Sequence, residues 1–148
     1  MTTQLIMDNV SIPIKRISFS DGSTNIQLQI PEGLNPSRYF SLSVNPTTPA
    51  DNYLWEISLV LDAIDQLVLE FSHSMLYLPY LAHARADRVF ETGNPHPIDC
   101  FLGKLWPNFD EIHLVDPHSD YYLKYEDLCE FSVKEQHQCF IDLLKSEV

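Results

Sequence analysis

The stretch Ser74-Met75-Leu76-Tyr77-Leu78 is short and apolar, and Pro79 ends it. Such a run predicts a buried strand of a parallel sheet. In the preceding residues, apolar side chains recur at the spacing of an α-helix. This pattern predicts a helix that begins with Asp51 or Asn52 as its N-cap and continues to about Glu70.

The same alternation of helix and strand continues toward the C-terminus. A second helix is expected to begin near Pro95 or Pro97, because proline is tolerated in the first helical turn. Residues Glu111 to Val115 predict another short strand, and Val133 to Lys145 predict a last helix. Strands that alternate with helices indicate an α/β fold with a parallel sheet flanked by helices.

The N-terminal part is expected to start with strands. Residues Thr24 to Ile30 alternate between apolar and polar side chains, and Ile12 to Phe19 provides an opposite arm. Asp21-Gly22-Ser23 supplies turn residues between the two arms, so a protruding β-hairpin is predicted. A further strand is expected from Tyr39 to Val44.

Composition excludes several classes of protein. The chain has 148 residues, of which 45% are hydrophobic, which suits one globular domain. Its net charge of −12 disfavours nucleic acid as a partner. No apolar run is long enough for a membrane helix and no signal peptide is evident, so a cytoplasmic protein without a membrane partner is expected. The three cysteines, Cys100, Cys129 and Cys139, lack zinc-knuckle spacing and are interpreted as reduced core thiols.

Two polar clusters follow predicted strands, where ligands bind in parallel α/β sheets. The first contains Arg85, Asp87 and Arg88. Arginine forks match phosphate oxygens, and a neighbouring carboxylate can orient one of them. A surface ion-pair cluster is the alternative interpretation of the same residues.

The second cluster contains Asp116 and His118, two positions apart, which an extended chain points to the same side. A carboxylate and a neutral imidazole can share a divalent cation. With Mg²⁺, one or two protein ligands are usually completed by substrate phosphate oxygens. A histidine hydrogen-bonded in a loop is the alternative. At the hairpin, Phe19 either offers a stacking face to a purine or simply stands beside a turn.

These segments, in this order, resemble ribose-phosphate diphosphokinase, also called phosphoribosyl diphosphate synthetase. The resemblance covers about residues 10 to 120 and rests on Phe19-Ser20-Asp21-Gly22, on the segment from Leu78 to Arg88, and on Asp116-Pro117-His118-Ser119. The middle motif of the family reads P-Y-A-R-Q-D-R and the later one D-L-H-x. The resemblance implies a three-layer α/β domain of the phosphoribosyltransferase-like kind, corresponding to the N-terminal half of the enzyme.

The family transfers diphosphate from Mg-ATP to ribose 5-phosphate, a step in the biosynthesis of nucleotide precursors. The resemblance implies that Phe19 stacks on adenine and that Asp21 accepts a hydrogen bond from it. Arg85 would hold ATP phosphates, and His118 would be the Mg²⁺ ligand with Asp116 beside it. The ATP-binding residues predicted on this basis are Phe19, Asp21, Ser23, Arg85, Asp87 and Arg88, and no catalytic residue is predicted.

The sequence departs from the family at three positions of these motifs. Ser23 replaces a carboxylate of the hairpin, Ala86 replaces a glutamine, and Pro117 replaces an aliphatic residue. The family's second domain carries a loop of the type Asp-Asp-x-x-x-Thr-Gly-x-Thr that holds ribose 5-phosphate, and this sequence has no two adjacent aspartates. The chain is therefore expected to lack the ribose-phosphate-binding domain and to be inactive when isolated.

Three functions remain open on the sequence. The chain is either the nucleotide side of a diphosphokinase that needs a second domain or chain for ribose 5-phosphate, or a catalytically silent relative, or a structural oligomerisation domain. A silent relative would bind nucleotide, or assemble with a full-length enzyme and regulate it. The expected partners are ATP or ADP with Mg²⁺ and a further copy of the chain, because an uncovered apolar surface favours homo-oligomers.

Overall fold

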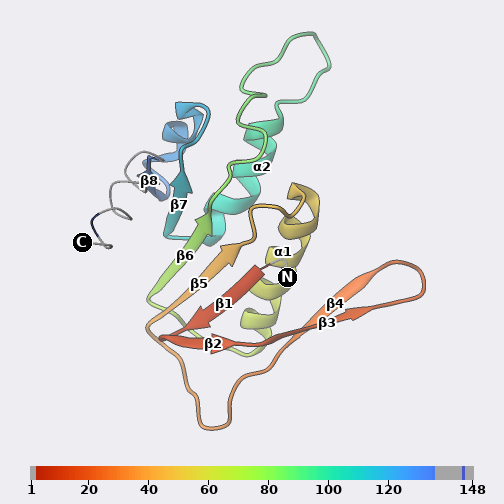
Figure 1. Cartoon of the computed structure of the whole chain (residues 1–148), viewed down its shortest axis with the longest axis vertical. Helices are drawn as coiled ribbons and strands as arrows, with labels where there is room; N and C mark the ends of the chain where they lie inside the picture. The colour runs from red at the N-terminus through yellow and green to blue at the C-terminus, as the bar shows by residue number, and fades with distance from the viewer. Residues whose placement is uncertain (1–2, 136–144, 146–148) are drawn as a thin grey trace. The chain divides into compact units, whose positions relative to one another are not determined.

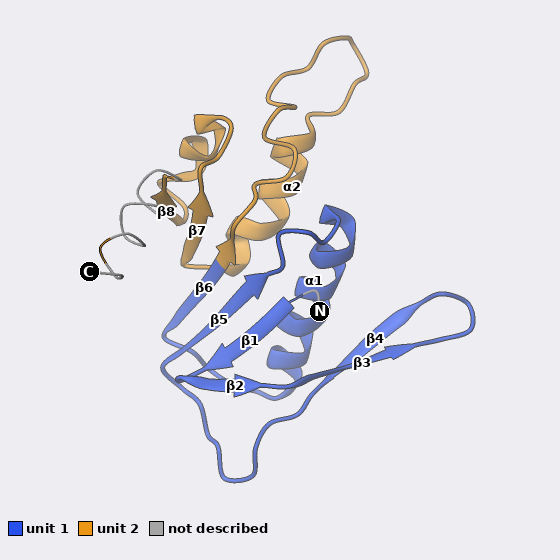
Figure 2. Ribbon diagram, viewed as in Figure 1, with its two compact units in different colours: residues 1–76 blue, residues 77–148 orange. Residues whose placement is uncertain are grey.

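The computed structural model describes residues 3–135 and residue 145. The chain divides into two compact units, Met1–Leu76 and Tyr77–Val148 (Figure 2). Each unit has its own strands, helix and buried side chains, and each contains one of the cavities described below. Among the described residues, no helix is long and apolar enough to cross a membrane.

The first unit is built from strands around one helix. Its elements are β1 (Thr3–Met7), β2 (Val10–Ile12), β3 (Ile14–Ser18), β4 (Thr24–Leu28), β5 (Tyr39–Val44), α1 (Ala50–Gln66) and the start of β6 (His73–Leu78). Strand β1 pairs antiparallel with both β2 and β5, and the order of strands in this unit is β2-β1-β5-β6. Strands β3 and β4 form a separate two-stranded sheet, which is the protruding hairpin (Figure 1).

A buried carboxylate connects three elements of the first unit. Glu56 of α1 is 8% exposed and accepts hydrogen bonds from the backbone N–H of Thr3 at 3.1 Å and from the Thr3 hydroxyl. The guanidinium of Arg16, on β3, donates to the same carboxylate from Nε at 2.9 Å and from Nη2 at 2.5 Å. Nη2 and Nη1 of Arg16 also donate to the carbonyls of Thr3 and Ile14, at 3.0 and 3.2 Å. The root of the hairpin is thereby fastened to both β1 and α1.

The second unit continues from the end of β6. It contains α2 (Pro97–Leu105), the short 3₁₀ helix η1 (Trp106–Asn108), β7 (Glu111–Val115), the 3₁₀ helix η2 (Asp120–Tyr125) and β8 (Glu130–Lys134). Strands β7 and β8 pair in parallel, from Glu111 opposite Glu130 to Val115 opposite Lys134. The buried face of α2 consists of Ile98, Phe101, Leu102 and Leu105, as its apolar spacing predicts.

The mixed α/β class, the hairpin and strands β5, β6 and β7 are confirmed, whereas the limits of α1 were predicted wrongly. The helix begins at Ala50, because the carbonyl of Pro49 already accepts from the N–H of Asn52 at 3.1 Å. Asp51 therefore lies inside the first turn and is not the N-cap. The helix ends at Gln66, because Val68 adopts a left-handed φ of 54° that cannot continue it.

Three further predictions differ from the structure. Strands β1 and β2 were not expected. Val133 and Lys134 belong to β8 and not to a last helix, and residues 136–144 of that prediction lie outside the described residues. Cys100 is exposed, so it is not a core thiol, whereas Cys129 is buried as expected. Cys139 also lies outside the described residues.

Candidate functional site

A cavity of about 440 Å³ lies in the second unit at the ends of two segments. Its lining consists of Tyr80, Leu81, Ala84, Arg85, Asp116, Pro117 and His118. The first four residues follow β6, and the last three follow β7. The structure thus brings Arg85 of one sequence cluster together with Asp116 and His118 of the other, although about thirty residues separate them in the chain.

A tight turn sets the direction of Arg85. His83 has a left-handed φ of 62°, and the N–H of Ala86 donates to its carbonyl at 2.8 Å. The turn buries Ala84 and leaves Arg85 exposed. Among the residues that the structure describes, none forms an ion pair with Arg85, so its guanidinium is available to an anion. Phosphate oxygens match such a fork.

The chain bends after β7 at Asp116, which has a left-handed φ of 43°. Its N–H donates to the carbonyl of Lys134 at 3.0 Å and thereby ties the end of β7 to β8. The next residue after His118 is Ser119, whose hydroxyl donates to the carbonyl of Ala84 at 3.2 Å. This hydrogen bond joins the two segments that line the cavity.

Asp116 and His118 are both exposed, and both line the cavity. Within residues 3–135, no group of three histidine, cysteine, aspartate or glutamate side chains could enclose a metal ion. A carboxylate and an imidazole beside a free guanidinium still suit Mg²⁺, since this ion is usually held by few protein ligands and completed by phosphate oxygens and water. The donor set therefore fits Mg²⁺ that arrives with a polyphosphate.

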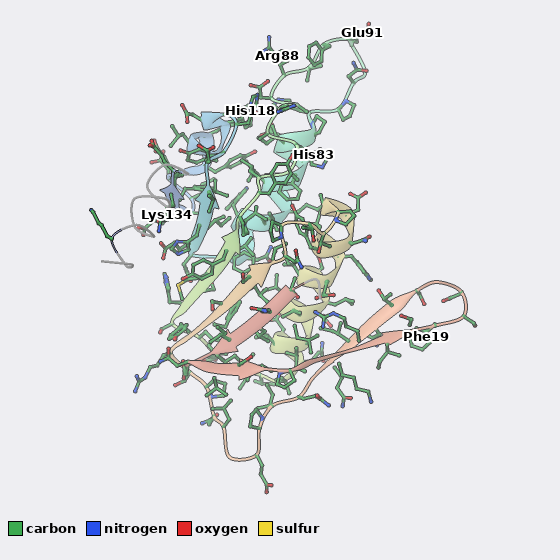
Figure 3. The ribbon with its side chains drawn as sticks, in the orientation of Figure 1. Phe19, His83, Arg88, Glu91, His118 and Lys134 are labelled. Atoms are coloured by element: carbon green, nitrogen blue, oxygen red, sulfur yellow. The ribbon has the colours of Figure 1, made fainter. Side chains whose placement is uncertain are left out.

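Two predicted residues do not line this cavity. The carboxylate of Asp87 lies 3.5 Å from Nε of Arg88, and the Arg88 side chain is 72% exposed. The Arg88 guanidinium also lies 5.9 Å from the ring centroid of Phe90. Figure 3 places Arg88 and Glu91 on the outer part of the loop that follows β6. Asp87 and Arg88 thus form an ion pair at the surface, and their role in phosphate binding stays a prediction.

The hairpin residues Phe19, Asp21 and Ser23 lie at the tip of β3–β4 in the first unit. Phe19 is 52% exposed (Figure 3). Oδ1 of Asp21 accepts from the backbone N–H of Ser23 at 2.9 Å and from its hydroxyl at 2.7 Å. These two hydrogen bonds hold the pKa of Asp21 below its ordinary value. In this conformation one oxygen of Asp21 is already occupied by Ser23.

Sequence reasoning missed a polar cluster between the start of α2 and η2. Asp99 accepts from the Tyr125 hydroxyl and, at 2.9 Å, from Nζ of Lys124. Nδ1 of His96 lies 3.2 Å from Oδ2 of Asp99 and 3.0 Å from the hydroxyl of Tyr121. The Tyr125 hydroxyl, with the other donors, holds the pKa of Asp99 far below its ordinary value. Burial and the neighbouring Asp99 raise the pKa of Tyr125 to about 12.

Sequence reasoning also missed Tyr80, which lines the cavity and is 61% exposed. Its position five residues before Arg85, in the turn after a buried strand, was the available signal. The cluster around Asp99 had no such signal, because His96 and Asp99 lie about 25 residues before Tyr121, Lys124 and Tyr125 in the sequence.

Comparisons with known proteins agree with the resemblance. No protein-family model matches the chain. A ribose-phosphate pyrophosphokinase (a synonym of diphosphokinase) of Methanopyrus kandleri is 29% identical over 122 residues, which are 82% of this chain and 40% of that protein. The pyrophosphokinase of Pyrococcus furiosus is 31% identical over 77 residues, which are 52% of this chain and 27% of that protein. The chain thus spans less than half the length of the curated relatives that it matches.

A solved structure supports the fold independently. The crystal structure of phosphoribosylpyrophosphate synthetase from Mycobacterium smegmatis has a TM-score of 0.67 to this chain at 16% sequence identity. The match covers 95% of this chain and 45% of that one. This likeness confirms the expected phosphoribosyltransferase-like α/β fold. Together with the curated relatives, it supports the resemblance of the chain to the N-terminal half of ribose-phosphate pyrophosphokinases.

Proposed function

We propose that this chain binds a Mg²⁺-nucleoside polyphosphate in the cavity of the second unit and supplies the nucleotide side of a ribose-phosphate pyrophosphokinase. The observation that supports this most is the meeting of Arg85, Asp116 and His118 in one cavity. An unpaired guanidinium and two oxygen- or nitrogen-donor ligands are what a metal-bound polyphosphate requires.

The roles of the residues follow from their chemistry. Arg85 would bind phosphate oxygens through its fork, and His118 with Asp116 would hold Mg²⁺, which neutralises phosphate charge when bound. Transfer of diphosphate depends mostly on positioning and charge neutralisation. The acceptor hydroxyl of ribose 5-phosphate would be held by a second domain or chain, since no adjacent aspartate pair occurs in these 148 residues. Phe19, at the hairpin tip of the first unit, would supply a stacking face for the base of a nucleotide bound by a neighbouring copy of the chain.

Calorimetry with ATP and Mg²⁺ tests the binding step. We expect weak binding that depends on the metal, because the ligands from the protein are few. Arg85→Ala should lower the affinity about tenfold, as loss of a charge-assisted hydrogen bond does, and His118→Ala should reduce the dependence on Mg²⁺. Lys104→Ala is the matched control, since it removes an exposed cation of α2 outside the cavity. Absence of binding by the wild type at about 5 mM nucleotide, well above ordinary KM values, would refute the proposal.

A catalytically silent relative is the second candidate. It is favoured by Ala86 in the motif of Arg85 and by Ser23, which occupies an oxygen of Asp21. An assay for phosphoribosyl diphosphate separates the candidates when the chain is mixed with a separate domain that carries the ribose-phosphate loop. Product formed only by the mixture supports the split enzyme. Nucleotide binding without product supports the silent relative.

A further inference from the structure

A second cavity, of about 530 Å³, lies entirely in the first unit between the hairpin and α1. The hairpin contributes its polar residues, and α1 contributes Asp51, Asn52, Trp55, Glu56 and Leu59. The indole of Trp55 is 56% exposed, which is unusual for a residue of this size on a helix. No residue that lines the cavity of the second unit lines this one, and Ser23 is the one predicted ATP-binding residue that does.

The charges of the lining decide what the cavity can bind. Arg16 is poorly suited to receive an anion, because four of its five guanidinium N–H groups donate to Glu56 or to backbone carbonyls and its charge is paired with Glu56. The carboxylate of Glu56 is also occupied, because it accepts hydrogen bonds from Arg16 and Thr3. Asp51 is exposed, and the described residues provide it with neither a hydrogen bond nor an ion pair. Asp51 is therefore the one charged group of the lining that is left for a ligand among the described residues.

An aromatic face beside an unpaired carboxylate is a combination that selects organic cations. Asp51 and Trp55 are four residues apart on α1, which places them on the same side of the helix. A guanidinium or ammonium group over an indole is attracted by the ring, and a carboxylate adds a charge-assisted hydrogen bond. The net charge of −12 increases the local concentration of cations at the surface.

We propose that this cavity binds an organic cation with a guanidinium or alkylammonium group, held between Trp55 and Asp51. Ser18 and Thr24 of the hairpin also line the cavity, and their hydroxyls are suitable partners for the remaining N–H groups. Such a group occurs both in free polyamines and in arginine or lysine side chains of a polypeptide. Both sources present the same chemistry to the site.

Tryptophan fluorescence can report binding at Trp55 directly. Trp106→Phe removes the other tryptophan, and a phenyl ring keeps an aromatic neighbour for Tyr125, whose ring is stacked on Trp106 at 6.2 Å. This variant is titrated with N-acetylarginine amide, with spermidine, and with N-acetylcitrulline amide, which has nearly the same shape without the charge. We expect saturable changes with a cationic probe, weakened by salt, and none with the citrulline compound.

Asp51→Asn in the same background should weaken the binding about fivefold or more, a factor that corresponds to one exposed cation–π or carboxylate contact. Asp62→Asn is the matched control, because Asp62 is an exposed carboxylate of α1 outside the cavity. Thermal unfolding of both variants checks that they fold, since Asp51 also stands in the first helical turn.

The probes also distinguish the source of the cation. A response to spermidine alone assigns the cavity to polyamines, and a response to the arginine compound assigns it to polypeptide side chains. The proposal is overturned if neither cation gives a response at about 10 mM, which lies well above the usual range of KM values for small ligands. Equal binding of the citrulline compound, or equal affinity of the Asp51→Asn variant, overturns it as well.

Discussion

Replacement of Arg16 by methionine should expose how strongly the hairpin is fastened to the first unit. The substitution keeps the aliphatic stem and removes four hydrogen bonds, two of them to the buried carboxylate of Glu56. Removing one partner of a fully buried ion pair costs about 3–5 kcal/mol. The side chain of Arg16 is 31% exposed, so water can partly replace its hydrogen bonds to Glu56 in the variant. We therefore expect the free energy of unfolding to fall by about 2–3 kcal/mol at pH 7.

The dependence of this loss on pH follows from the environment of Glu56. In the wild type, burial raises the pKa of Glu56, but hydrogen bonds from Arg16 and Thr3 outweigh it, and the pKa lies below its ordinary value. This carboxylate therefore contributes stability above its ordinary pKa, and the contribution is lost as pH falls through the lowered pKa. In the Arg16→Met variant, burial dominates and raises the pKa of Glu56. Protonation of Glu56 on acidification then removes the buried unpaired charge that destabilises the variant. The difference in stability between wild type and variant should narrow between pH 7 and about pH 4.

Urea unfolding followed by circular dichroism measures this difference at both pH values. Lys15→Met is the matched control, because Lys15 is the exposed neighbour on β3 and its loss should change stability by less than about 0.5 kcal/mol. Adding Glu56→Met to Arg16→Met should recover part of the lost stability, since no buried charge then remains. This reasoning is refuted if Arg16→Met lowers the free energy of unfolding by less than about 1 kcal/mol, since loss of a buried ion-pair partner should cost more. It is also refuted if the difference in stability between wild type and variant stays constant on acidification.

Three further predictions concern the second unit. Asp99→Asn should lower the pKa of Tyr125 from about 12 toward its ordinary value, because the neighbouring carboxylate helps to raise it; absorbance of the phenolate at alkaline pH measures this, and an unchanged titration contradicts it. Leu102→Ala on the buried face of α2 should reduce the free energy of unfolding by about 2–5 kcal/mol in denaturant titrations, and a smaller loss would mean that the site collapses. The exposed Cys100 should react with a thiol reagent much faster than Cys129, which is buried and has its pKa raised to about 11, mainly by burial. Mass spectrometry of labelled peptides distinguishes the two thiols, and equal rates would contradict their assigned environments.

The strands with clear apolar alternation could be predicted from sequence, and those without it could not. Strand β7 matches its predicted range Glu111–Val115 because a proline and two aspartates bound an apolar run. Strand β1 buries Thr3 and leaves Ile6 37% exposed, so hydrophobic spacing does not reveal which face is inside. The sequence does contain turn residues after β1, namely Asp8-Asn9. In the structure both have positive φ, as in a two-residue hairpin turn.

The candidate site was predicted in part for a similar reason. The sequence indicates which polar residues follow buried strands, and Arg85, Asp116 and His118 do meet in one cavity. The sequence does not determine side-chain direction within a turn. The left-handed residue His83 turns Arg85 toward the cavity lining, whereas Asp87 and Arg88 follow the turn and pair with each other. The cluster around Asp99 depends on tertiary contact between α2 and η2, which no local pattern encodes.

The left-handed backbone of Asp116 restricts which amino acids can occupy this position over the course of evolution. At a φ of 43°, glycine, asparagine and aspartate are tolerated much better than branched or bulky residues. A lineage that no longer needed a carboxylate here could drift to asparagine or glycine without losing the turn that ties β7 to β8. Aspartate and asparagine at this position are thus interchangeable for folding, and only the charge distinguishes a ligand from a turn residue.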